Sequence, residues 1–207
     1  QGFVRRIRGA RDGQWRAAMR QTVSAAFGPA QSSGPGAPWG DAIAAAIAHA
    51  PYLARLTSRR VDLLEGIDAD WPERLLLSAH TIARDITRAP PPIEEGMRAL
   101  RRAKDAVHLA TAIADLARAW PLARVTGALT DFADAALHAA LAMAASECAR
   151  RGDIKLAAFD DSNGAAPGFT LIAMGKMGAG ELNYSSDIDF SVFFDAEKLA
   201  AANAREP

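Results

Sequence analysis

The pattern of apolar and polar positions divides the chain into a long helical part and a shorter part that contains strands. Between residues 41 and 151, apolar side chains recur at intervals of three and four, which is typical of helices with one buried face. Helices are predicted over 41–49, 51–64 and 72–88, and three prolines at 90–92 separate the last of these from the next helix. Two later series continue the helical pattern: Ile93, Met97, Leu100, Val107, Ala110 and Ala114, then Ala133, Leu137, Ala140, Leu141, Ala144 and Cys148.

The spacing of apolar residues changes from a helical to a strand-like pattern after Gly168. The run "FTLIAM" (169–174) is short, apolar and followed by glycine, and "IDFSVFF" (188–194) alternates partly and is rich in β-forming residues. Both are predicted to be strands. Because two strands alone do not make a stable sheet, we expect either that helices cover them or that the chain is a fragment of a longer polypeptide.

Two turn-rich stretches set the predicted domain boundaries. "GPAQSSGPGAPWG" (28–40) and "DDSNGAAPG" (160–168) are too rich in glycine, proline and serine to continue a helix. The prediction is therefore a basic N-terminal arm and linker (1–40), a helical region (41–159), a linker (160–168) and the incomplete first strands of another domain (169–207). The arginines of the first twenty residues are expected to be a solvated terminus rather than a docking arm.

Composition narrows the class of protein. Lysine plus arginine and aspartate plus glutamate both number 24, so the net charge is zero and a general nucleic-acid binder is not expected. No apolar run approaches the roughly 18 residues of a membrane span. A single cysteine, Cys148, excludes an intrachain disulfide and suits a reducing, cytoplasmic location. The four tryptophans (Trp15, Trp39, Trp71 and Trp120) are expected to anchor helix packing.

The candidate chemistry lies in "GKMGAGELNYSSDIDF" (175–190). On an extended segment, Asp187 and Asp189 would point to the same face, with Ile188 anchored in the core behind them. Two converging carboxylates suit a hard divalent cation such as Mg²⁺ or Mn²⁺, which commonly also binds substrate phosphates.

The residues before the aspartates have the properties of a phosphate site. Gly175 and Gly178 allow close approach of the backbone to a ligand, and a helix beginning near residue 178 would direct free N–H groups at a phosphate. Lys176 adds a cation, and Ser185 and Ser186 add hydroxyl groups. An anion site facing a metal-binding aspartate pair is what phosphoryl or nucleotidyl transfer requires.

These residues alone leave two readings open. The segment matches neither G-x-G-x-x-G nor G-x-x-x-x-G-K-[ST], so a dinucleotide-binding Rossmann motif and a P-loop are both disfavoured. What remains is a strand, a glycine-rich turn and D-x-D at the next strand. That pattern fits a metal-dependent nucleotidyltransferase and a structural turn with solvated aspartates about equally.

A resemblance separates them. The motif resembles, almost position by position, that of the bacterial bifunctional enzymes that add AMP to glutamine synthetase and remove it. More broadly, it resembles the DNA polymerase β-like nucleotidyltransferase superfamily. "PYLARLTSRRVDLL" (51–64) and "LRRAKDAVHLATAIADLA" (100–117) resemble the helical segments that precede the first catalytic domain of those enzymes. The resemblance implies a mainly α part followed by the start of an α/β (α+β) nucleotidyltransferase domain.

The resemblance also implies a function. It points to the N-terminal, adenylyl-removing domain, in which phosphate attacks the AMP on a tyrosine of adenylylated glutamine synthetase and releases ADP. Asp187 and Asp189 would bind Mg²⁺ or Mn²⁺, while Gly175 and Ser186 would lie beside the phosphates. Expected partners are glutamine synthetase, a PII-type signalling protein, ADP or ATP, and phosphate. Glu181 and Asn183 fit the motif, and their expected role is to support the residues that bind the metal.

Three points stay open at this level. Ala179 stands where the family usually has glycine, a minor departure. Superfamily members use a third carboxylate from a later strand, for which Asp195 is a poor candidate, so the active site of this chain is expected to be incomplete. The alternatives are ATP-dependent adenylylation and a non-catalytic helical module (41–151) that docks glutamine synthetase or a PII-type protein.

Overall fold

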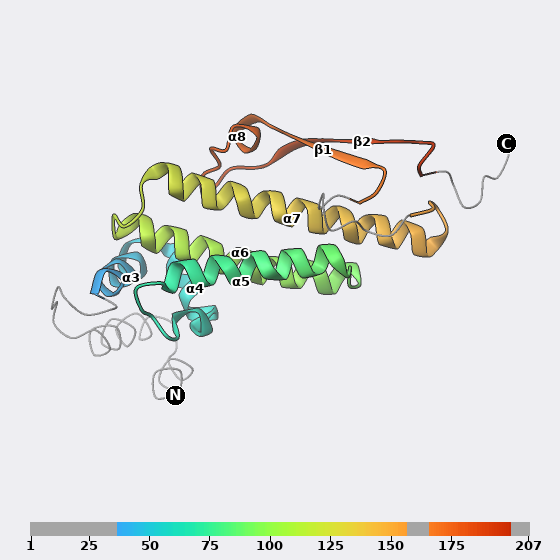
Figure 1. Cartoon of the computed structure of the whole chain (residues 1–207). Helices are drawn as coiled ribbons and strands as arrows, with labels where there is room; N and C mark the ends of the chain where they lie inside the picture. Colours follow the sequence, from blue (N-terminus) through green and yellow to red (C-terminus); the bar gives the residue numbers. More distant parts are fainter. Residues whose placement is uncertain (1–36, 157–165, 200–207) are drawn as a thin grey trace. The chain divides into compact units, whose positions relative to one another are not determined.

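A computed structural model describes residues 37–156 and 166–199. The basic arm, Trp15 and most of the two predicted linkers lie outside these ranges. The described residues form two compact units, one of residues 37–76 and 105–125 and the other of residues 77–104, 126–156 and 166–199. Figure 1 shows the order of the elements: several helices, then a β-hairpin. No helix of the described part is long and apolar enough to cross a membrane.

The first unit contains α3 (Ala37–His49), α4 (Pro51–Arg59) and the 3₁₀ helix η1 (Val61–Leu64). The prediction that residues 28–40 are a non-helical connector is wrong for the last four, because α3 begins at Ala37. Its proline is the second residue, and the first turn of a helix tolerates proline. The single helix predicted over 51–64 is also wrong, since the chain leaves the α conformation at Arg60 (φ −121°, ψ 57°).

Arg60 is held in place by two carboxylates. Its Nε donates to Asp62 Oδ1 at 3.0 Å, and its Nη1 lies 3.5 Å from Asp105 Oδ2 on a helix much later in the sequence. The Arg60 side chain is only 12% exposed. The pair with Asp62 fits the break between α4 and η1, because a continuing α-helix would carry residues 60 and 62 to different faces.

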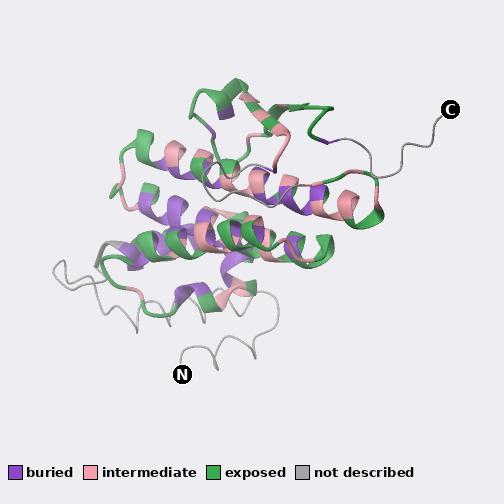
Figure 2. Ribbon diagram, turned by 45° about the vertical axis from the view of Figure 1, so that its right-hand side comes forward, coloured by how far each residue is buried: buried purple, intermediate pink, exposed green. Residues whose placement is uncertain are grey.

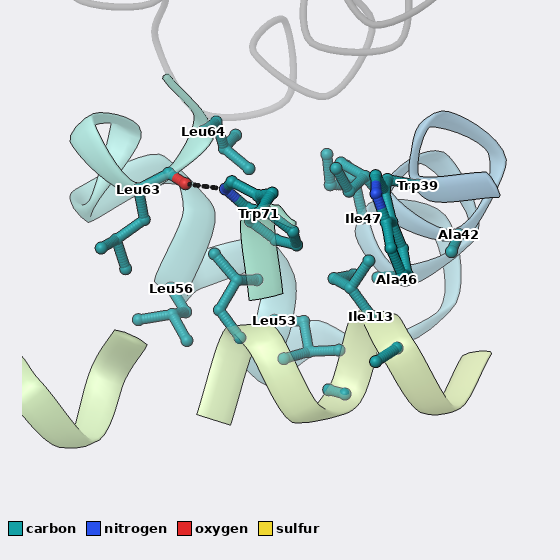
Figure 3. Close-up of a cluster of buried hydrophobic side chains, with 14 of the residues drawn as sticks. Trp39, Ala42, Ala46, Ile47, Leu53, Leu56, Leu63, Leu64, Trp71 and Ile113 are labelled. Carbon is teal, nitrogen blue, oxygen red and sulfur yellow. Dashed lines mark hydrogen bonds between the residues drawn. The ribbon is translucent and has the colours of Figure 1, made fainter. Parts of the chain in front are cut away.

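Two tryptophans organise the core of the first unit (Figure 3). Trp71, the first residue of α5 (Trp71–Arg88), is 1% exposed and donates its indole N–H to Leu63 O at 2.8 Å. Trp39 donates to Asp68 O at 2.8 Å, and the two rings are 6.4 Å apart between centroids. Trp120 packs against the same cluster. The prediction that tryptophans anchor helix packing is thus confirmed for Trp39, Trp71 and Trp120.

The second unit is formed by parts of three long helices and the hairpin. α5 ends at Arg88, α6 spans Ile93–Leu116 and α7 spans Leu122–Arg151, so the three prolines separate α5 from α6 as predicted. Ala83, Ile86, Ala139 and Met143 form a small buried cluster. Gly96 on α6 lies so close to Met143 on α7 that an added Cβ would overlap the methionine sulfur.

Both predicted strands are present. β1 (Phe169–Met174) and β2 (Asp189–Phe194) pair antiparallel, from Phe169 opposite Phe194 to Met174 opposite Asp189. One face carries only apolar side chains: Phe169, Leu171, Ala173, Phe190, Val192 and Phe194. The opposite face carries Asp189. Figure 2 shows that most residues of the hairpin, and of the turn that joins its two strands, are exposed or half-buried.

Candidate active site

The glycine-rich motif forms the connection between the two strands. The short helix α8 (Gly175–Gly178) follows β1 without a break. Three backbone hydrogen bonds then tighten the turn: Ala179 N to Gly175 O (3.1 Å), Gly180 N to Met177 O (3.1 Å) and Glu181 N to Lys176 O (2.8 Å). The prediction of a helix beginning near residue 178 is wrong, because the helix ends there. The motif therefore offers no long helix whose N-terminus could bind a phosphate.

Glycine is required at positions 175 and 178 for different structural reasons. Gly175 has φ +57°, a conformation that favours glycine, and a Cβ built on it would lie 3.1 Å from Asp189 Oδ2. A Cβ on Gly178 would lie 2.6 Å from the backbone oxygen of Ala173. Gly178 thus lets α8 fold against the end of β1. The backbone of Gly175 lies beside a candidate metal ligand, whereas the tight contact at Gly178 is with the chain itself.

The aspartate pair lies at the start of β2. Asp189 is the first residue of the strand, while Asp187 precedes the strand, and both side chains are exposed. The prediction that Ile188 anchors this segment in the core is wrong, since its side chain is 40% exposed. Residue 188 lies just before the paired part of β2, so the sheet does not bury it. Lys176 is also exposed, in α8.

A closed polar turn leads into the pair. Asn183 Oδ1 accepts hydrogen bonds from Ser185 N (3.1 Å) and Ser186 Oγ (2.9 Å). Asn183 N donates back to Ser186 Oγ (3.2 Å), and Ser186 N donates to Asn183 O (3.2 Å). Asn183 and Ser186 therefore fix the backbone that delivers Asp187. The sequence places Asn183 in the motif, but its hydrogen bonds with Ser185 and Ser186 are seen only in the structure.

Two apolar residues hold the motif to the rest of the second unit. Met177 and Leu182 are each 4% exposed, although most of their neighbours in the motif are exposed. The backbone N–H of Leu182 also donates to Thr130 Oγ1, at 3.2 Å. Thr130 lies on α7, 52 residues earlier. No local signal in the sequence marks Thr130, because its significance arises only when α7 meets the motif.

Comparison with known proteins identifies the family of the chain. The family model described as "Glutamate-ammonia ligase adenylyltransferase" matches residues 40–207. The chain belongs to this family. The resemblance seen in the motif and in the two helical segments is thereby confirmed at the level of the family.

Several relatives of this adenylyltransferase family are similar over most of the chain. They are named bifunctional glutamine synthetase adenylyltransferase/adenylyl-removing enzyme. The one from Caulobacter vibrioides is 48% identical over 83% of the chain, that from Bradyrhizobium diazoefficiens 42% over 82%, and that from Rhizobium meliloti 37% over 81%. In each case the matched part is 17% of the relative's own length. No solved structure matches the chain.

The donor set of the family motif fits a divalent cation in part. Asp187 and Asp189 supply carboxylate oxygens, and Mg²⁺ readily completes its shell with water and substrate phosphates. Within residues 37–156 and 166–199, no group of three or more His, Cys, Asp or Glu side chains is arranged to hold a metal ion. Asp187 and Asp189 are the candidate metal ligands in this part of the chain.

Asp195 belongs to a different local structure. It follows the last residue of β2, at the opposite end of the hairpin from Asp189. The backbone N–H groups of Lys198 and Glu197 donate to its Oδ1, at 3.3 and 3.1 Å, and Lys198 Nζ lies 3.5 Å from Oδ2. These hydrogen bonds, that of Lys198 foremost, lower the pKa of Asp195. Asp195 closes its own turn.

Proposed function

We propose that the chain is part of a metal-dependent nucleotidyltransferase that removes AMP from the adenylylated tyrosine of glutamine synthetase. The observation that carries the proposal is the placement of Gly175 beside Asp189, with Asp187 just before the strand, in a member of the adenylyltransferase family. The names of the relatives supply glutamine synthetase as the substrate protein. The reaction would occur in cytoplasm and contribute to control of nitrogen assimilation.

The proposed reaction is phosphorolysis. An oxygen of inorganic phosphate forms a bond to the AMP phosphorus, the bond from that phosphorus to the tyrosine oxygen breaks, and the products are ADP and free tyrosine, whose oxygen regains a proton. Asp187 and Asp189 would hold Mg²⁺ or Mn²⁺. When bound, the ion would neutralise charge on the reacting phosphate oxygens.

The other residues would position the phosphates. Because Gly175 has no side chain, a phosphate could approach a metal ion held by Asp189 from that side. Lys176 would add positive charge, and the hydroxyl group of Ser185 would donate a hydrogen bond. Ser186, whose proton is directed at Asn183 Oδ1, would hold the turn beside the phosphates. Catalysis would depend on this positioning rather than on a covalent intermediate with the protein.

The wider architecture is part of the same proposal. The strand, glycine turn and D-x-D would be the beginning of a DNA polymerase β-like nucleotidyltransferase domain, with a third carboxylate from another strand. A PII-type protein would be a regulatory partner. The second candidate activity is ATP-dependent adenylylation, because the relatives are named for both activities. Removal is favoured by the helical segments before the motif.

The test uses the natural full-length protein that contains this sequence, with Asp187→Asn. ADP release from adenylylated glutamine synthetase is followed with phosphate and Mg²⁺, and AMP incorporation from ATP is followed in parallel. We expect removal to fall by about 100-fold or more while addition persists, since a charge that acts in the transition state is lost. Asp195→Asn, at the far end of the hairpin, is the control and should retain both activities.

The opposite results are informative. Loss of addition with removal retained would assign this site to adenylylation. No loss of either activity would mean that the aspartates are structural, and that the helices serve as a docking module.

A further inference from the structure

The hydroxyl group of Thr130 bridges α7 and the motif. It donates to Thr126 O at 2.9 Å, the usual bond of a threonine to the preceding helical turn. The same oxygen accepts the N–H of Leu182 at 3.2 Å. Since its single proton is directed at Thr126 O, the oxygen presents lone pairs to Leu182. Thr130 is half-buried and Leu182 is buried.

Leu182 lies between the turn that follows α8 and the segment that leads to Asp187. On its N-terminal side, Glu181 N donates to Lys176 O, which closes the turn after α8. On its C-terminal side begins the Asn183–Ser186 network that delivers Asp187. A tether at Leu182 therefore fixes both the glycine turn and the aspartate-bearing segment relative to α7.

We propose that Thr130 is a positioning residue for the aspartate pair, acting through the N–H of Leu182. This inference rests on the proposed function of that pair. Thr130 itself touches neither aspartate, so its contribution is to restrict the conformations of residues 182–187. The bond from the Leu182 N–H to Thr130 is partly buried, and without the hydroxyl this N–H loses its protein acceptor, which favours opening of the segment.

The variant Thr130→Val removes the hydroxyl and keeps the shape of the side chain. Thr130→Ala is a second variant that removes the hydroxyl without burying a new methyl group. Thr130→Ser restores the hydroxyl and should restore the behaviour. Thr87→Val is the matched control, because Thr87 makes the same kind of bond within its own helix, to Ala83 O at 3.0 Å, in the same unit.

Two measurements on the natural full-length protein test the proposal. The first is the hydrogen-exchange rate of the Leu182 amide, which should rise by roughly 3- to 10-fold in Thr130→Val and Thr130→Ala, the loss expected for one hydrogen bond. The second is the Mg²⁺ concentration that gives half-maximal AMP removal, which should rise by a similar factor while KM for adenylylated glutamine synthetase is unchanged. Thr130→Ser and Thr87→Val should resemble the natural protein in both.

Failure of this inference is distinguishable from failure of the proposed function. Unchanged exchange at Leu182 would overturn the tether, whatever the activity. Faster exchange with an unchanged Mg²⁺ requirement would overturn the positioning role. The proposed function itself fails only if Asp187→Asn retains AMP removal, and the exchange measurement does not depend on that result.

Discussion

Gly175 and Asp189 face each other where the two strands meet the glycine turn: a Cβ on Gly175 would lie 3.1 Å from Asp189 Oδ2. Met174 is the register partner of Asp189, so Gly175 is the first residue beyond the sheet. Its positive φ turns the chain away while leaving the carboxylate uncovered. The same residue thus serves the turn and leaves space beside the candidate metal ligand.

Replacing this glycine should affect both stability and the aspartate. Gly175→Ala places an L-residue in the left-handed region, which should lower the free energy of unfolding by about 1–2 kcal/mol. The new methyl group would also displace the Asp189 carboxylate, and misplacement of a reacting group should lower kcat for AMP removal by on the order of tenfold. Denaturant unfolding and steady-state kinetics measure the two effects.

Gly66→Ala is the control for Gly175→Ala, because it introduces the same backbone strain without crowding a neighbouring side chain. Gly66 has φ +63°, and its added Cβ would make only an ordinary contact, 3.8 Å from Arg74 Nη2. Its stability loss should be similar, with kcat unchanged. Equal kcat values for the two variants would refute a specific effect of Gly175 on Asp189.

Gly178→Ala should destabilise the protein by steric overlap. The added Cβ would meet the Ala173 carbonyl oxygen at 2.6 Å, and backbone cannot move aside as a flexible side chain can. We expect a loss of about 1–3 kcal/mol in the free energy of unfolding. Gly127→Ala on α7, with nothing within 4 Å, should instead gain about 0.5–1 kcal/mol. A higher free energy of unfolding for Gly178→Ala would contradict the close approach of Gly178 to the Ala173 carbonyl oxygen.

Trp71→Phe should cost more stability than Trp39→Phe. Both remove an indole donor, but the bond from Trp71 to Leu63 O is buried, whereas that from Trp39 to Asp68 O is partly buried. Water can replace the donor only at the second site, so the excess loss should be about 1–3 kcal/mol for Trp71→Phe. Denaturant unfolding compares the two, and equal losses would contradict the assigned burial.

The Glu147–Arg150 pair should make stability depend on pH. Arg150 Nη2 and Nε donate to the two oxygens of Glu147 at 2.7 and 3.0 Å, and this lowers the pKa of Glu147 in the folded state. The unfolded state therefore binds its proton first as pH falls. The stabilisation is present above the ordinary glutamate pKa of about 4.3 and is lost below it.

Glu147→Gln should therefore flatten the dependence of unfolding free energy on pH between about 5 and 3. Because the pair is at the surface, about 1 M salt should reduce the difference between the variant and the natural protein. Superimposable pH profiles at low salt would argue against a contribution from this pair.

The local pattern of the sequence determined the type of most elements. Apolar spacing located the long helices, because one buried face imposes its period directly on the chain. The triple proline marked the boundary before Ile93 because proline cannot donate a helical hydrogen bond. The strands at 169–174 and 188–194 were predicted because both runs are short, apolar and rich in β-forming residues. The motif identified the family. The roles of Asp187, Asp189 and their neighbours remain predictions.

Tertiary contacts decided the rest, because they join residues that no local pattern connects. The break at Arg60 is accompanied by an ion pair with Asp105, and the early start of α3 accompanies the burial of Trp39 against Trp71. The need for glycine at 178 comes from Ala173 O. Thr130 reads as an ordinary helical threonine until Leu182 folds against it, 52 residues later. Sequence thus determined which residues carry the candidate chemistry, while the packing of helix and turn decided how they are held.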